Sequence, residues 1–146
     1  MEYKIVELTK EIMAKDFQGF CETLNNLRLV GEITLEKAKT TLDKINLQDS
    51  HIFVAIDDNF KILATTTIMI EQKFIRNNAL AGHIEDVSTR KGFEKQGLAT
   101  IVINSAINYA KSRGCYKIIL DCENELKLFY SKFGFKEEGL FMALRF

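Results

Sequence analysis

The stretch that most constrains the fold is "RKGFEKQGLA", residues 90–99, because it joins two segments of different hydrophobic period. The preceding segment, "ALAGHIEDVST" at residues 79–89, is typical of a β-strand. After the loop, apolar residues recur every four positions, as in a helix: Leu98, Val102, Ala106 and Ala110. The nearly continuous apolar run at residues 116–122 then predicts a strand buried on both faces. Together these segments predict a strand–loop–helix–strand unit.

The same reasoning assigns the rest of the chain. Apolar residues at three- and four-residue spacing predict one amphipathic helix over residues 13–27. Thr34 is a suitable N-cap for a second helix that begins at Leu35. The remaining predicted elements are strands at residues 3–8, 51–56, 60–73 and 136–146 and a short helix at residues 126–133. The predicted order is βααβββαβαβ, a mixed α/β (α+β) sandwich and not a doubly wound Rossmann domain.

Composition limits the class of protein. The 146 residues contain no proline and no low-complexity stretch, so residues 1–146 are interpreted as a single domain. The charges of twenty basic and twenty acidic residues cancel, so the chain lacks the net positive charge that is typical of a nucleic-acid-binding domain. Cys21, Cys115 and Cys122 lack CxxC spacing, so we expect reduced thiols and no metal. With neither a signal peptide nor a membrane-spanning run in sight, we expect a soluble, cytoplasmic protein.

The loop between strand and helix suggests an anion site. At a helix start the first backbone N–H groups have no partner within the helix, and the helix dipole is positive there. Gly97 and the small Ala99 would let a phosphate or pyrophosphate approach those groups. The loop matches neither the P-loop pattern GxxxxGK[ST] nor the Rossmann pattern GxGxxG. A glycine in such a turn is also common for structural reasons alone.

The residues of this loop resemble a known family. "EKQGLA" after a strand is similar to the pyrophosphate-binding loop of the GNAT acetyltransferases, Gln/Arg-x-x-Gly-x-Gly/Ala, from which Glu94 departs at the first position. "GHIEDV", "GCYKIILDC" and "FYSKFGF" resemble segments of the eukaryotic glucosamine-6-phosphate N-acetyltransferase family, as do "LVGEIT" and the terminal "ALRF". The resemblance covers nearly the whole chain and is densest from Gly82 to Gly134. It implies a GNAT fold with a mixed, mostly antiparallel sheet flanked by helices.

The resemblance also implies a cofactor and its contacts. Acetyl-CoA would be the co-substrate, without a metal. Its pantetheine would pair with the backbone of a splayed strand, and its pyrophosphate with the loop and helix start. The residues implied are Val87, Ser88 and Thr89 on the strand, and Lys95, Gln96, Gly97, Leu98, Ala99 and Thr100 at the loop and helix. Backbone donors carry this role, so we expect Ala99 in place of glycine to be tolerated.

Acetyl transfer to an amine requires a proton acceptor and, for the departing thiolate, a proton donor. The resemblance places Asp121 at the amine of the sugar, although an Asp at a strand end can also cap the following helix. Tyr130 is implied as the acid and as a cofactor contact, although a tyrosine on an apolar stripe is typical of a core. Strand alternation predicts that Glu85 and Asp86 face opposite ways, which leaves a backbone contact for one of them.

A phosphorylated acceptor requires cations. The resemblance implies sugar-phosphate contacts for Lys117 and Arg145, and it places Tyr116 and the segment containing Lys73 and Arg76 at the substrate. Each of these basic residues could equally be a solvated surface charge. Arg28 stands where the family has a small hydroxyl residue, so an extra phosphate ligand is one interpretation of it.

Two histidines and one cysteine are further candidates for catalysis by residue type. His51 and His83 are interpreted as structural histidines, since nothing around them in the sequence predicts a general base. Cys122 follows Asp121, but no helix start or basic neighbour would activate its thiol, so direct transfer in a ternary complex is preferred over an acetylated cysteine.

The resemblance implies an enzyme that acetylates glucosamine 6-phosphate in UDP-N-acetylglucosamine biosynthesis. It further implies a homodimer with shared active sites, to which the apolar tail "GLFMALRF" would contribute. Two alternatives stay open at this point. One is a GNAT enzyme for a protein lysine or polyamine, which the acidic residues would suit. The other is a non-catalytic acyl-CoA-binding module, against which the presence of both Asp121 and Tyr130 argues.

Overall fold

A sheet in the order β1-β2-β3-β4-β5 forms the centre of the computed structural model, which describes residues 2–146. Its strands are β1 (Lys4–Glu7), β2 (Ser50–Ile56), β3 (Ile62–Gln72), β4 (Leu80–Thr89) and β5 (Lys117–Ile119). Strands β1 to β4 pair antiparallel with one another in that order, and β5 pairs parallel with β4. The sheet is thus mixed and mostly antiparallel, which confirms the predicted fold class.

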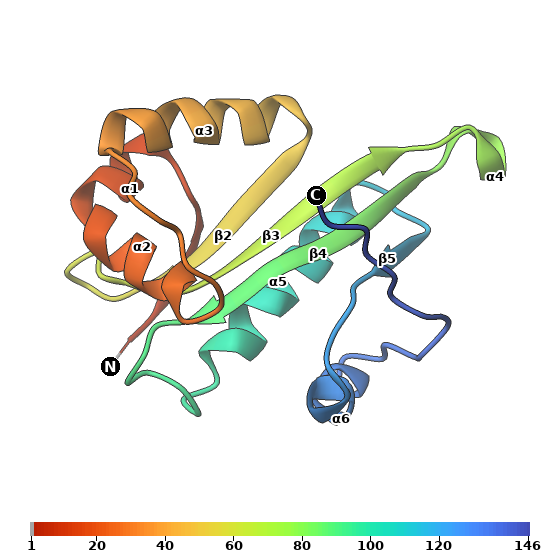
Figure 1. The fold of residues 1–146 in the computed structure, drawn as a ribbon. Helices are drawn as coiled ribbons and strands as arrows, with labels where there is room; N and C mark the ends of the chain where they lie inside the picture. The colour runs from red at the N-terminus through yellow and green to blue at the C-terminus, as the bar shows by residue number, and fades with distance from the viewer. Residues whose placement is uncertain (1) are drawn as a thin grey trace.

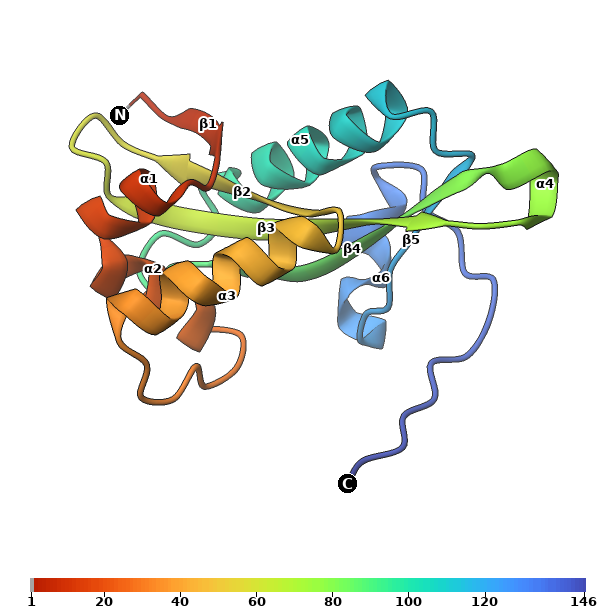
Figure 2. The ribbon, with the colours of Figure 1, turned by 90° about the horizontal axis from the view of Figure 1, so that it is seen from above.

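Helices cover both faces of this sheet (Figure 2). On one face lie α1 (Lys10–Lys15), α2 (Phe17–Asn25) and α3 (Leu35–Leu47), and on the other lies α5 (Leu98–Ser112). The four apolar residues that predicted α5 are all buried, and Leu98 is 1% exposed. The short elements are α4 (Ile75–Asn78), η1 (Asn124–Leu126) and α6 (Lys127–Ser131). Within residues 2–146, no helix is long and apolar enough to cross a membrane.

The single helix predicted over residues 13–27 is wrong, because the chain forms two helices with Asp16 between them. Asp16 has φ −144° and ψ 56°, outside the helical region. Its Oδ1 accepts a hydrogen bond from the Gly19 N–H at 3.2 Å, which caps α2. Its Oδ2 accepts from the Ile62 N–H at 2.8 Å, at the start of β3. A contact with a distant strand therefore stabilises the break. Thr34 caps α3 as predicted, by accepting from the Lys37 N–H.

The predictions for the C-terminal part are wrong in two places. The strand expected at residues 116–122 is reduced to β5, whose Lys117 and Ile119 are exposed, because β5 lies at the edge of the sheet beside β4 alone. The closing strand expected at residues 136–146 does not form among the described residues. A strand needs a neighbour for its backbone hydrogen bonds, and the tail runs away from the sheet (Figure 2). The large apolar side chains of this tail are exposed, from Leu140 to Phe146.

A bulge interrupts β4 beside the acidic pair Glu85 and Asp86. The pairing of β3 with β4 passes from Thr65–Ser88 to Thr67–Glu85, so β4 carries one extra residue at this point. Asp86 occupies the left-handed region with φ 51°. The bulge interrupts the alternation of the strand at Glu85 and Asp86, and both residues are exposed. That the two side chains face opposite ways stays a prediction.

Candidate active site

The parallel strands β4 and β5 diverge beside this bulge (Figure 1). Their pairing is confined to Ala81–Lys117, Gly82–Ile118 and His83–Ile119. Beyond His83, β4 continues to Thr89 with no parallel partner among the described residues. An unpaired strand edge can accept an extended ligand through main-chain hydrogen bonds. This edge contains the residues expected to bind pantetheine, Val87, Ser88 and Thr89.

Ser88 and Thr89 of this edge already have hydrogen-bond partners in α2 and at its C-terminal end. The buried Ser88 hydroxyl donates to the Thr23 carbonyl of α2 at 2.5 Å. The Thr89 carbonyl accepts from the Asn26 side chain at 2.7 Å. Val87 packs its side chain into the core under α5. These contacts fix the strand. Because the Thr89 carbonyl already accepts from Asn26, any ligand role falls to the remaining backbone groups of the three residues.

The loop that follows β4 leads directly into α5. Gly92, Lys95 and Gly97 all have positive φ, at 89°, 61° and 81°. Gly97 is the N-cap residue, and no side chain caps the helix there. The N–H groups of Leu98, Ala99 and Thr100 therefore open the helix without an intrahelical partner. Left-handed residues and a helix start together form an anion-binding concavity.

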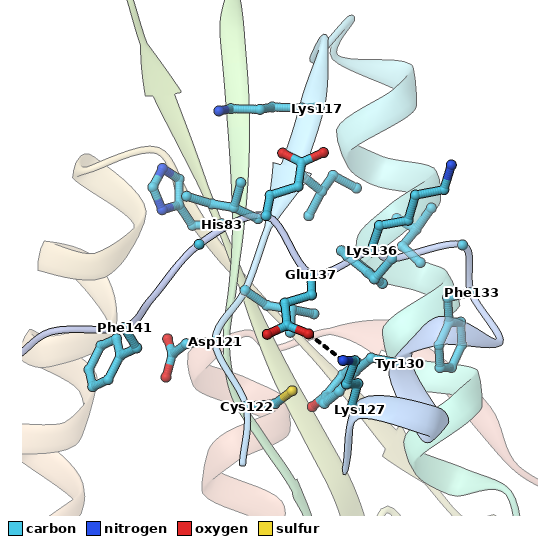
Figure 3. A pocket seen from close by; sticks show the side chains of 18 of the residues that line it. His83, Lys117, Asp121, Cys122, Lys127, Tyr130, Phe133, Lys136, Glu137 and Phe141 are labelled. Carbon is cyan, nitrogen blue, oxygen red and sulfur yellow. Dashed lines mark hydrogen bonds and ion pairs between the residues drawn. The ribbon is translucent and has the colours of Figure 1, made fainter. Parts of the chain in front are cut away.

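A pocket of about 950 Å³ lies between β5, α6 and the C-terminal tail. Figure 3 shows the side chains of Asp121, Cys122, Lys127 and Tyr130 gathered there. Five of the expected site residues line it: Glu85, Tyr116, Lys117, Asp121 and Tyr130. The tail covers part of it, and Lys127 of α6 forms an ion pair with Glu137 of the tail.

The acidic side of the pocket contains Glu85, beside which Asp86 and Asp121 lie. Burial raises the pKa of Glu85 above its usual range, and the negative charges of Asp121 and Asp86 raise it further. Like charges held together disfavour ionisation, and a cation placed among them would be stabilised. The cluster is therefore suited to an amine that arrives as an ammonium ion and leaves its proton behind.

Tyr130 lies on the apolar side of the pocket. It is 8% exposed and packs edge-on against Phe129 and Phe135. Burial raises the pKa of its phenol, and Cys122 and Asp121 add to this. The phenol therefore stays protonated at neutral pH and can donate a proton. Sequence pattern alone favoured a core tyrosine, and Tyr130 is buried and also lines the pocket.

The expected cations fall into two groups. Arg76, in α4, and Lys117, in β5, lie over the ring of Tyr116, at 4.9 Å and 5.5 Å from its centroid. Lys73 lies near them in the chain but pairs with Glu71 at 3.0 Å. Arg28 and Arg145 line no part of the large pocket. Arg28 is exposed and donates to the Leu27 carbonyl, and Arg145 is exposed in the tail.

Some pocket residues were missed by sequence reasoning. Lys127 precedes Tyr130 by three positions, and that spacing places two residues on one face of a helix. Glu137 could not be found, since the tail was expected to be a strand. His83 lines the pocket, and its Nε2 lies 3.1 Å from the Glu71 carboxylate, which agrees with a structural role. Among residues 2–146, no group of three His, Cys, Asp or Glu side chains could hold a metal.

The chain is similar to known acetyltransferases. Residues 14–135 match the model of the acetyltransferase (GNAT) family. A glucosamine 6-phosphate N-acetyltransferase of Arabidopsis thaliana is 39% identical over 132 residues, 88% of this chain and 89% of the relative. The enzyme of the same name from Candida albicans is 34% identical, with 87% of each chain covered. A crystal structure of the Arabidopsis thaliana enzyme superposes with a TM-score of 0.92 at 37% identity, covering 100% of this chain and 99% of the other.

Proposed function

Because the chain belongs to the GNAT acetyltransferase family, we propose that it transfers the acetyl group of acetyl-CoA to the amine of glucosamine 6-phosphate. The products are CoA and N-acetylglucosamine 6-phosphate, a precursor for UDP-N-acetylglucosamine. The observation that carries the proposal is the joint presence of an open helix start, a free strand edge and an acidic cluster beside a buried phenol.

Acetyl-CoA binds along the free edge of β4. Its diphosphate accepts hydrogen bonds from the backbone N–H groups of Leu98, Ala99 and Thr100, where the helix dipole favours negative charge. Its pantetheine pairs with the β4 backbone from Val87 to Thr89, and its thioester reaches the pocket near Tyr130. Leu98 anchors the start of α5 in the core, so the N–H groups are held in place before the ligand arrives.

The amine of the sugar enters as an ammonium ion and is held by Asp121, with Glu85 and Asp86 beside it. A carboxylate takes one proton, and the nitrogen lone pair attacks the thioester carbon in a ternary complex. The carbon–sulfur bond then breaks, and the thiolate takes a proton from the Tyr130 hydroxyl. The nitrogen loses its second proton to solvent as the amide forms, and solvent supplies a new proton to the phenolate. Positioning of the two reactants provides most of the rate enhancement.

The phosphate of the sugar lies among the cations beyond Tyr116. Arg76 and Lys117 are the candidates within one chain. Arg145 lies outside the pocket on an exposed apolar tail, and a second copy of the chain would cover that tail. In a homodimer the tail would bring Arg145 to the partner's site, and Arg28 would be a further cation near it.

A thiol-release assay with acetyl-CoA tests this function. Glucosamine 6-phosphate, unphosphorylated glucosamine and a lysine peptide are compared as acceptors. We expect turnover with the first and a much lower kcat/KM with the second, because the cations would lose their ligand. Preferred turnover of the lysine peptide would instead support an enzyme for protein lysines. CoA binding without turnover of any acceptor would support a non-catalytic module.

A further inference from the structure

Side chains of α2 and of its two cap residues hold the 90–97 loop. Asn26, the C-cap residue of α2, donates from its Nδ2 to the Thr89 carbonyl at 2.7 Å and to Glu94 Oε1 at 3.2 Å. The other oxygen of Glu94 accepts from the Gly92 N–H at 2.7 Å. Asn26 thus joins the end of β4 to the middle of the loop, and both oxygens of Glu94 are occupied.

Both ends of the loop are fixed as well. Arg90, at its start, pairs with Asp16 at 3.3 Å and with Glu22, and its N–H donates to the Leu63 carbonyl at 2.8 Å. At its end, the hydroxyl of Tyr3 donates to Gln96 Oε1 at 2.7 Å. The side chain of Gln96 is therefore engaged with Tyr3. Between these two anchors, Asn26 and Glu94 supply the cross-link.

The position of Glu94 presents an electrostatic problem. It lies three residues before the N-cap Gly97, where a bound diphosphate would be repelled by a mobile carboxylate. Backbone hydrogen bonds, chiefly those from Glu94 itself and Gly92, lower the pKa of this carboxyl, so it is ionised at neutral pH. Its charge is tolerable only if the side chain is held against the Gly92 N–H and the Asn26 amide.

We propose that Asn26 and Glu94 are positioning residues that hold the loop for the diphosphate of acetyl-CoA. Asn26 keeps the Glu94 carboxylate bound to the loop and away from the helix start, and the loop keeps the N–H groups of α5 open. Neither side chain needs to touch the reacting atoms. The inference rests on the proposed use of acetyl-CoA, and it deepens that proposal by assigning a role to the residue that departs from the family pattern.

The test is Asn26→Ala assayed with two acyl donors, acetyl-CoA and S-acetylpantetheine, which lacks the diphosphate. We expect kcat/KM for acetyl-CoA to fall about three- to tenfold, the effect of losing one hydrogen bond that organises a binding loop. The value for S-acetylpantetheine should fall less, because this donor is affected only through the hydrogen bond from Asn26 to the Thr89 carbonyl. The value of kcat with saturating acetyl-CoA should stay unchanged. The loss for acetyl-CoA should shrink at high salt, which screens the released carboxylate. An equal loss with both donors would overturn the proposal, because it would indicate a general structural defect.

Asn25→Ala is a matched control at the same helix end. Asn25 accepts from the Val30 N–H at 2.7 Å and makes no contact with the loop, so this variant should leave the ratio of the two donors unchanged. Glu94→Gln completes a double-mutant cycle. Once the charge is gone, Asn26→Ala should lower kcat/KM for acetyl-CoA less than it does in the unaltered protein, because only its hydrogen bond to the Thr89 carbonyl is then lost. Additive losses would refute the coupling. If Asn26→Ala does not fold, Asn26→Ser, whose side chain is too short to reach Glu94, takes its place.

Calorimetric titration with CoA separates this inference from the proposed function, since it needs no acceptor. If the unaltered protein binds CoA but does not acetylate glucosamine 6-phosphate, the proposed acceptor is wrong. In that case the role of Asn26 is still tested, because Asn26→Ala should bind CoA more weakly than the unaltered protein does. If the unaltered protein does not bind CoA, both proposals fail.

Discussion

An ion pair between Asp49 and Arg113 holds the C-terminal end of α5 against the turn between α3 and β2. The two terminal nitrogens of the Arg113 guanidinium donate to the two carboxylate oxygens of Asp49, at 2.8 Å and 2.7 Å. Asp49 Oδ1 also lies 3.0 Å from the Nε2 of His51. The hydrogen bonds from Arg113 are the main reason that the pKa of Asp49 falls from 3.8 to about 2. Replacing Asp49 by Asn removes the charge and keeps the shape.

The size of the effect follows from this pKa. A fall from 3.8 to about 2 corresponds to roughly 2.4 kcal/mol of stability. The side chain of Asp49 is 40% exposed, so solvent screening reduces the expected loss to about 1 kcal/mol. Because the folded protein lowers this pKa, the stabilisation is complete above the unfolded pKa near 4 and is lost as the pH falls towards 2.

Urea unfolding of the unaltered protein and of Asp49→Asn, measured from pH 7 to pH 3, tests this reasoning. The variant should be less stable by about 1 kcal/mol at neutral pH, and the gap should narrow below about pH 4. Asp43→Asn is the control, since the Asp43–Lys10 pair is similarly short at 2.8 Å but 52% and 44% exposed. It should change stability by less than about 0.5 kcal/mol. A gap that is constant over the whole pH range would refute an electrostatic origin.

Three further predictions concern the site. Tyr130→Phe should lower kcat about 10²-fold without changing the dissociation constant of acetyl-CoA, because it removes only the proton donor. A stopped-flow or steady-state turnover equal to that of the unaltered enzyme would remove Tyr130 from the mechanism. Gly97→Ala places a side chain at φ 81°, and a strain of about 1–2 kcal/mol should raise the KM for acetyl-CoA roughly 5- to 30-fold and leave the KM for the sugar unchanged. In Glu85, burial and like charges raise the pKa, so its ionisation costs stability as the pH rises above the unfolded value of about 4.3. In urea unfolding, Glu85→Gln should therefore be more stable than the unaltered protein at pH 7 and equally stable below about pH 4. The variant should also be less active. A loss of stability at pH 7 would contradict the raised pKa.

The candidate site shows how far sequence reasoning reached. The loop around Gly97 and the start of α5 were predicted from residue type and spacing alone, and the structure has both. Asp121 and Tyr130 were expected at one site, and they line one pocket together with Glu85. The contacts of Asn26 with Thr89 and Glu94 could not be predicted, because they join residues 63 and 68 positions apart.

The sequence by itself determined the features that depend on neighbouring residues. The four-residue repeat after Gly97 places α5 against the core, and the β-branched runs become β2 and β3. Tertiary structure decided where these patterns stop. Asp16 divides a predicted helix because its carboxylate accepts a hydrogen bond from the Ile62 N–H of a distant strand. The bulge at Asp86 interrupts β4 because β4 has one residue more than the segment of β3 that it pairs with. The hydrophobic period depends only on residues that are close together in the sequence. The partner of a hydrogen-bonding group, in contrast, depends on which distant segment folding brings next to it.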